Sequence, residues 1–323
     1  MFLLLHAHGK LGGSREMMKS YAILLAMRGF ITYNVSFRGC DGNEKTSRAS
    51  VFGEVDARDV LEMVKEIRKR ESDLEDDVEV KIHVLGYSFG AAVGALAVGL
   101  LHEKLRQKNI DVCSESEERT VWSRCGIDGL ILVAFPLGSL NPFATTSTIM
   151  GVLSRFLFGK HAGRLRKCFV KDARNRSLVA RKTRLLFVHG QRDEFTRVKE
   201  VRKFCEKLAK GQPAEEDVND DDDEENNDDE EFNENEFNEK QNNNLISDFF
   251  FGVEDDDDSD DDDSEKPVES SYETFGNNIG TSNAPPHLAL LEIKGKKSDH
   301  FGFVKVKKQR DLLVKHISRF VLA

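Results

Sequence analysis

The chain of 323 residues has 57 acidic and 47 basic side chains, a formal net charge of −10 and 39% hydrophobic residues, which suits one large α/β domain or two smaller ones. Its five cysteines form an odd set without a Cys-x-x-Cys pair, which argues against a disulfide framework and a structural zinc site. The longest apolar run, Ala91 to Leu101, is too short to span a bilayer, and the first residues lack the basic segment of a signal peptide. We therefore expect a soluble protein of the cytoplasm, with the nucleus as the alternative compartment.

Short apolar runs alternate with amphipathic stretches along most of the chain. This pattern predicts β-α units around a mostly parallel central sheet with helices on both faces. The predicted strands, in chain order, are Phe2–His6, Phe30–Ser36, Val78–Leu85, Ile127–Phe135, Arg184–His189 and Leu288–Ile293. The predicted helices are Arg15–Arg28, Val55–Arg70, Ala91–Lys104, Arg197–Lys210 and Arg310–Val321, and residues 140–182 are expected to be a mixed, partly helical excursion.

Residues 211–286 interrupt this pattern between a helix and a strand. Residues 214–265 alone hold 27 of the 57 acidic residues and a single basic residue, Lys240, so the rest of the chain is basic. We expect 211–286 to be a disordered, low-complexity insertion, because it cannot bury enough apolar surface to offset its ordering entropy. It would divide one domain into a first part, 1–210, and a last part, 287–323, and it would emerge at the sheet edge opposite the strand carboxyl ends.

A nucleophile motif follows the third predicted strand. Gly86-Tyr87-Ser88-Phe89-Gly90 matches Gly-x-Ser-x-Gly, in which a tight turn between strand and helix lifts the serine hydroxyl clear of the sheet. The pattern alone also fits a tight turn with an inert serine. Its position between an apolar strand and a helix of small residues favours the nucleophile.

A serine hydroxyl needs a base, and the base needs a carboxylate that orients it. Asp193 ends the turn after the strand at 184–189 and is the candidate acid, with Glu194 as the second choice. The alternative role for Asp193 is a carboxylate that only starts the next helix. His300, in the loop between the last strand and the closing helix, is the candidate base, and the chain order serine, acid, histidine is that of α/β-hydrolases.

The oxyanion hole is expected to combine two backbone amides. One is the amide of Phe89, which follows the nucleophile, and the other is that of Gly9 or Lys10, in the loop after the first strand. His6 and His8 could instead bind a metal, although no third ligand is placed near them. No cofactor is expected.

These blocks resemble the α/β-hydrolase superfamily, and most closely a branch of small predicted hydrolases related to dienelactone hydrolases. The resemblance covers nearly the whole chain outside 211–286 and rests on His6-Ala7-His8, Ser36-Phe37-Arg38-Gly39, Gly86–Gly90, Phe135-Pro136-Leu137-Gly138, His189–Phe195 and Asp299-His300-Phe301. It implies a serine hydrolase. The apolar residues of Leu140–Phe158 suit the cover of an acyl pocket, which makes an ester, thioester or similar small acyl compound the expected substrate. Some relatives imply the alternative, a catalytically silent interaction protein whose acidic tract contacts basic partners.

The stretch 160–184 has ten basic residues and a single acidic one, Asp172. A solvated spacer is the preferred interpretation of the acidic insertion, and self-contact of the insertion with this stretch is the alternative hypothesis. The stretch lacks interleaved aromatic residues and any nucleic-acid motif, so we expect no specific nucleic-acid binding.

Overall fold

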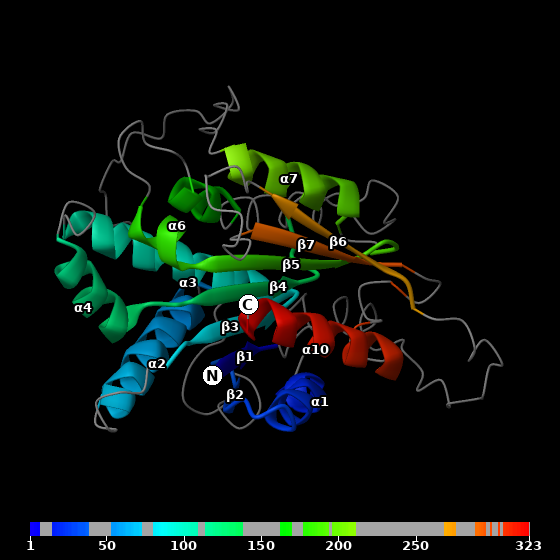
Figure 1. Ribbon diagram of the computed structural model, residues 1–323, viewed down its shortest axis with the longest axis horizontal. Coiled ribbons are helices and arrows are strands. Elements are labelled where there is room, and N and C mark those ends of the chain that lie inside the picture. Colours follow the sequence, from blue (N-terminus) through cyan, green and yellow to red (C-terminus); the bar gives the residue numbers. More distant parts are fainter. Residues whose placement is uncertain are drawn as a thin grey trace, which may run out of the picture.

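A seven-stranded sheet organises the computed structural model (Figure 1), which describes residues 1–6, 15–38, 53–72, 80–108, 114–137, 162–169, 177–193, 196–210, 268–275, 288–294, 298, 303 and 306–322. The strand order is β2-β1-β3-β4-β5-β7-β6, and every neighbouring pair is parallel except β6 with β7. The strands are β1 (Phe2–Leu5), β2 (Thr32–Val35), β3 (His83–Tyr87), β4 (Gly129–Val133), β5 (Arg184–Gly190), β6 (Ser270–Phe275) and β7 (Leu288–Ile293). The predicted mostly parallel α/β architecture is therefore confirmed.

Helices cover both faces of the sheet. Side chains of one buried cluster come from α2 (Glu54–Ser72), α3 (Phe89–Gln107), α4 (Glu115–Cys125), α6 (Leu178–Lys182) and α7 (Val198–Lys210). The cluster on the other face includes side chains of α1 (Arg15–Ala26) and α10 (Lys307–Leu322). A further helical segment, 162–169, contributes to the first cluster. Among the described helices, none combines the length and apolar character that crossing a membrane requires.

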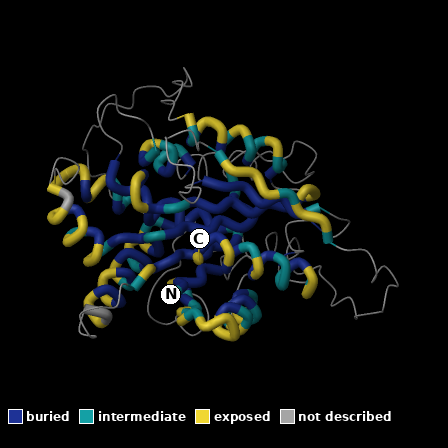
Figure 2. Tube along the Cα trace, in the orientation of Figure 1, coloured by how far each residue is buried: buried dark blue, intermediate teal, exposed yellow. Residues whose placement is uncertain are grey.

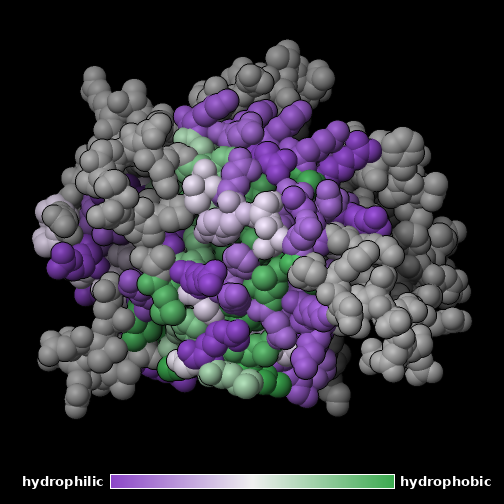
Figure 3. Space-filling view, turned by 45° about the vertical axis from the view of Figure 1, so that its right-hand side comes forward, coloured by the Kyte–Doolittle hydropathy of each residue, from purple (hydrophilic) through white to green (hydrophobic). Residues whose placement is uncertain are grey.

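The central strands are apolar because both of their faces are covered. All residues of β1, β3, β4 and β7 are buried, as Figure 2 shows, whereas the edge strands β2 and β6 are partly exposed. In the space-filling view of Figure 3, hydrophilic side chains cover the α7 side of the molecule.

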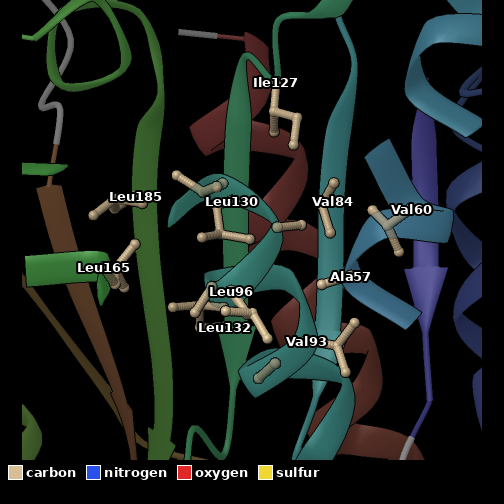
Figure 4. Packing of buried hydrophobic residues seen from close by; sticks show 14 of the residues in the cluster. Ala57, Val60, Val84, Val93, Leu96, Ile127, Leu130, Leu132, Leu165 and Leu185 are labelled. Atoms are coloured by element: carbon tan, nitrogen blue, oxygen red, sulfur yellow. The ribbon is translucent and has the colours of Figure 1, made fainter. Parts of the chain in front are cut away.

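The core beneath α3 shows how helix and sheet interlock. Val93 and Leu96 of α3 belong to the same buried cluster as Val84, Leu130 and Leu132 of the strands (Figure 4). Each such side chain contributes about 1.5–3 kcal/mol when fully buried. Gly94 of α3 faces the strands, where a Cβ would lie 3.1 Å from Leu130 and 3.3 Å from Val84. This packing holds the start of α3 against the carboxyl end of β3, where the Gly-x-Ser-x-Gly motif lies.

The predicted C-terminal boundary of the disordered insertion, residue 286, is wrong, because residues 270–275 form the strand β6. The acidic composition of the preceding tract favoured disorder despite the aromatic residues Tyr272 and Phe275. Antiparallel pairing with β7 nevertheless provides hydrogen-bond partners for the backbone of β6. Residues 211–267 lie outside the described residues.

Residues 211–267 leave and rejoin the described structure at opposite ends of the parallel strands. The tract starts after Lys210, where α7 ends after running back from the carboxyl ends of the strands, as expected. It returns at the carboxyl edge, since Ser270 pairs with Ile293 and the N–H of Lys294 donates to the carbonyl of Glu269 at 2.9 Å. The expectation that the insertion lies opposite the carboxyl ends of the strands is therefore wrong for its C-terminal end, which rejoins the sheet beside those carboxyl ends.

Candidate active site

Ser88 stands in a strained turn between β3 and α3. Its backbone has φ 51° and ψ −116°, in the positive-φ region that residues with a side chain rarely adopt. The turn leaves Ser88 half-buried, while Tyr87 before it and Phe89 after it are buried. The hydroxyl is thus brought to the carboxyl edge of the sheet, as the motif predicts.

The two motif glycines are required by close backbone approach. A Cβ on Gly86 would lie 2.3 Å from the carbonyl oxygen of Gly90, and a Cβ on Gly90 would lie 2.4 Å from that of Leu5. Any side chain at either position would push α3 away from the sheet. The glycines therefore fix the distance between the helix start and the strands β1 and β3.

Phe89, whose amide is the predicted oxyanion donor, lies at the start of α3. Phe89 is the first residue of α3, and the first N–H groups of a helix have no acceptor within the helix and lie at the positive end of its dipole. The centroids of the Phe89 and Phe37 rings are 5.9 Å apart, and those of the Phe37 and His6 rings are 4.8 Å apart. Aromatic contacts therefore connect the ends of β1 and β2 to the residue after the nucleophile.

Main-chain hydrogen bonds tie the turn of Ser88 to its neighbours along the carboxyl edge. The N–H of Ser88 donates to the carbonyl of Val133 at 2.9 Å, and the N–H of Ala134 donates to that of Val188, also at 2.9 Å. Ala134, like Ser88, has φ 51°. These bonds connect the nucleophile turn through the end of β4 to the end of β5.

The same edge continues from β5 to the histidine loop. The N–H of Gln191 donates to the carbonyl of Ile293 at 2.9 Å, and the N–H of Arg192 donates to that of Ser298 at 3.1 Å. Arg192 precedes Asp193, and Ser298 is two positions before His300. The chain segments that carry the candidate acid and base are therefore joined by their backbones.

Asp193 is buried, with 5% of its surface exposed. Its Oδ1 accepts from the N–H of Thr196 at 3.1 Å, and its Oδ2 lies 3.7 Å from Nε2 of His189. The Nε2 atom of His189 also lies 2.5 Å from the carbonyl oxygen of Thr196. Our sequence reasoning missed Thr196 and set His189 aside, although His189 sits four positions before the acid.

The histidine loop is held at both described ends. Ser298 is fully buried and bonded to Arg192, and Phe303 is fully buried and accepts through its carbonyl from the hydroxyl of Tyr21 in α1. Burial raises the pKa of Tyr21 far above its ordinary value, which keeps the hydroxyl protonated as a donor. His300 itself lies between these anchors and outside the described residues.

Several other expected residues also lie outside the described residues. These are the oxyanion candidates Gly9 and Lys10, the second-choice acid Glu194, His8 of the alternative metal pair and the pocket stretch Leu140–Phe158. Within the ranges that the structure describes, no three metal-ligating side chains gather.

Comparison with known proteins gave matches among solved structures. One match is an α/β serine hydrolase homologue from Coxiella burnetii, which is 17% identical to this chain. The alignment covers 66% of this chain and 70% of the homologue, with a TM-score of 0.36. The esterase Pf2001 from Pyrococcus furiosus is 18% identical over 65% and 68% of the two chains, with a TM-score of 0.38. An esterase from Thermogutta terrifontis is 15% identical over 66% and 67%, with a TM-score of 0.40.

No protein-family model matches the chain, and no curated protein matches it. At identities of 15–18%, these matches carry no information about the activity of this chain, which depends on the groups at its site. The described part of that site offers a hydroxyl on a strained turn, a helix N-terminus beside it and a buried carboxylate tied to the histidine loop. Such groups suit acyl transfer through a serine nucleophile.

Proposed function

We propose that the chain is a serine hydrolase that cleaves an ester, thioester or similar acyl bond through Ser88, Asp193 and His300. The observation that carries this proposal is the backbone of Ser88, a non-glycine residue with φ 51° between a buried strand and a helix N-terminus. Strain of this kind persists only where the surrounding structure enforces it, and it clusters at functional sites. A serine that merely closed a turn would not need it.

In the proposed reaction, the oxygen of Ser88 attacks the acyl carbon while His300 accepts the hydroxyl proton. The resulting oxyanion accepts hydrogen bonds from the N–H of Phe89 and from that of Gly9 or Lys10. The intermediate then collapses, and the departing alcohol or thiol takes the proton from His300. Asp193 accepts the other ring N–H of His300 throughout, which fixes its tautomer and stabilises its cation.

A water molecule completes the cycle. His300 takes a proton from the water, and the hydroxide attacks the acyl carbon bound to Ser88. The second intermediate releases the carboxylic acid as the proton passes back to Ser88. The apolar stretch Leu140–Phe158 is the proposed cover of the acyl group, which makes a small acyl compound the proposed substrate class.

Labelling with a fluorophosphonate probe tests this function without knowledge of the substrate. We expect the wild type to be labelled at Ser88, and Ser88→Ala and His300→Ala to lose labelling. Ser123→Ala is the matched control, because Ser123 is an exposed serine on α4, a helix that packs against α2. Peptide mass mapping identifies the modified residue.

The outcome separates the hydrolase from the interaction protein. Labelling of the wild type and of Ser123→Ala, lost in the other two variants, supports the triad. A folded wild type that is never labelled would contradict the hydrolase and favour the silent interaction protein.

A further inference from the structure

We propose that His189 is a positioning residue for the acid of this site, which holds the turn that carries Asp193 and so orients Asp193 toward the base. This inference rests on the proposed hydrolase function, because it gives His189 its role through Asp193. His189 has no contact with the substrate in this proposal and is not itself catalytic.

The position of His189 excludes direct contact with bulk solvent. It is the penultimate residue of β5 and is 1% exposed. Side chains alternate along a strand, so His189 shares a face with Leu185 and Phe187, whose cluster includes residues of α7. The imidazole is therefore enclosed between the sheet and α7, directly beneath the acid turn.

A hydrogen bond fixes the tautomer of His189. The carbonyl of Thr196 can only accept, so the Nε2 atom at 2.5 Å from it must carry a hydrogen. The N–H of Thr196 in turn donates to Oδ1 of Asp193 at 3.1 Å. Thr196 thus links the two side chains, and its own hydroxyl accepts from the N–H of Leu137 at 3.4 Å.

The carboxylate of Asp193 lies directly beside the His189 ring. The ring nitrogen Nε2 is 3.7 Å from Oδ2 of Asp193, so a change at position 189 alters the surroundings of the acid itself. Among the described residues, Glu292 is the register partner of His189 on β7, and it pairs with Arg202 of α7 at 2.8 Å.

A purely structural histidine is the competing explanation, because a buried ring also fills space. An apolar residue would fill the same space without the cost of burying two polar nitrogens. His83 supplies the comparison: it is buried at the start of β3, 3% exposed, and its burial lowers its pKa to about 3. It lies at the opposite end of the strands from Ser88.

The test compares His189→Gln, His189→Asn and His189→Leu with His83→Leu. Each full-length variant is assayed with p-nitrophenyl acetate across pH 5–9, and its fluorophosphonate labelling rate is measured. Gln places an amide N–H near the position of Nε2 and can reach Thr196, whereas the shorter Asn and the apolar Leu cannot. The wild type, labelled at Ser88, establishes the parent function independently.

We expect His189→Leu and His189→Asn to lower kcat about 10- to 100-fold with little change in KM, as a misplaced catalytic group does. The acidic limb of the pH profile should move to lower pH, because a base with a poorly aligned carboxylate is easier to deprotonate. His189→Gln should restore both kcat and the profile, and His83→Leu should keep them.

Wild-type kcat and pH profile in His189→Asn or His189→Leu would overturn the positioning role, and so would equal losses in His83→Leu. If His189→Leu fails to fold, the comparison of His189→Gln with His189→Asn still decides, because both keep a polar amide. Absence of labelling in the wild type would remove the proposed function, and this inference with it.

Discussion

The backbone N–H of Arg192 donates to the carbonyl oxygen of Ser298 at 3.1 Å. This bond joins the residue before the candidate acid to a residue two positions before the candidate base. Because it uses main-chain groups, it survives substitution of either side chain. Alignment of Asp193 with the histidine loop is therefore built into the backbone, and side chains adjust it from there.

Tyr21 holds the other end of the histidine loop, since its hydroxyl donates to the carbonyl of Phe303 in the core. Tyr21→Phe should lower the free energy of unfolding by about 1–3 kcal/mol, because a buried acceptor loses its donor. It should also reduce kcat more than it raises KM. Denaturant unfolding and ester hydrolysis measure the two effects, with the partly exposed Tyr33→Phe as control, expected to change stability by less than about 0.5 kcal/mol. Equal stabilities for the two variants would contradict this role of Tyr21.

Gly90 should not tolerate a methyl group, because its Cβ would lie 2.4 Å from the carbonyl oxygen of Leu5. We expect Gly90→Ala to lose more than about 3 kcal/mol of unfolding free energy, or to be insoluble. Gly163→Ala is the opposite case: Gly163 lies in the 162–169 helix, its Cβ would meet nothing within 4 Å, and the change should stabilise by up to about 1 kcal/mol. Thermal unfolding of both variants checks the contrast, which a soluble Gly90→Ala of wild-type stability would refute.

The central strands were predictable because they are apolar runs whose two faces are both covered. The boundaries predicted for Leu288–Ile293 agree with β7. By contrast α4 was missed, because Val121 and Trp122 are its few apolar residues, although the capping box of Ser114 and Glu117 is a readable start signal. β6 was missed because its pairing with β7 is a nonlocal property.

The site was predictable in one respect and hidden in another. The Gly-x-Ser-x-Gly spacing predicted the turn at Ser88, because close backbone approach demands glycine at fixed positions. The hydrogen bonds along the carboxyl edge involve main-chain groups from strands far apart in sequence, so no residue pattern records them. His189 and Thr196 carry no such pattern, because their contacts with Asp193 depend on how the turn after β5 folds.

Asp56 predicts a pH-dependent stability. Burial, its largest cause, raises the pKa of Asp56 from 3.8 to about 6. The folded state then holds the proton more tightly than the unfolded state, so this contribution to stability is full below about pH 4 and is lost as pH rises through 6. The loss amounts to about 3 kcal/mol for a shift of about two units.

Asp56→Asn removes this titration and should gain stability relative to the wild type between pH 4 and pH 7. Chemical denaturation at several pH values measures the difference. Asp59→Asn is the control, because Asp59 is exposed and pairs with Arg38, so its effect should be at most about 1 kcal/mol. A difference between Asp56→Asn and the wild type that is constant with pH would contradict the prediction.

Because β6 is part of the sheet, we expect two deletions of the acidic region to differ in their effect on stability. Removing 211–286 takes away β6, exposes the edge of β7 and breaks the bond of Arg202 with Glu273 at 3.0 Å, so we expect aggregation or a clear loss of stability. Removing 214–265 keeps all of these contacts, and stability should change little. Thermal unfolding and light scattering compare the two proteins, and equal stability would contradict the structural role of β6.

The shorter deletion also tests the proposed contact between the acidic tract and the basic stretch 160–184. Part of that stretch is already paired, because Arg181 binds Glu118 of α4 and Arg164 lies 3.9 Å from Glu103 of α3. A contact with the remaining basic side chains should weaken as salt screens it. The full chain should therefore show a salt-dependent labelling rate at Ser88 that the protein without 214–265 lacks. If both proteins respond to salt alike, the tract acts as a spacer, and its charge serves solubility rather than the site.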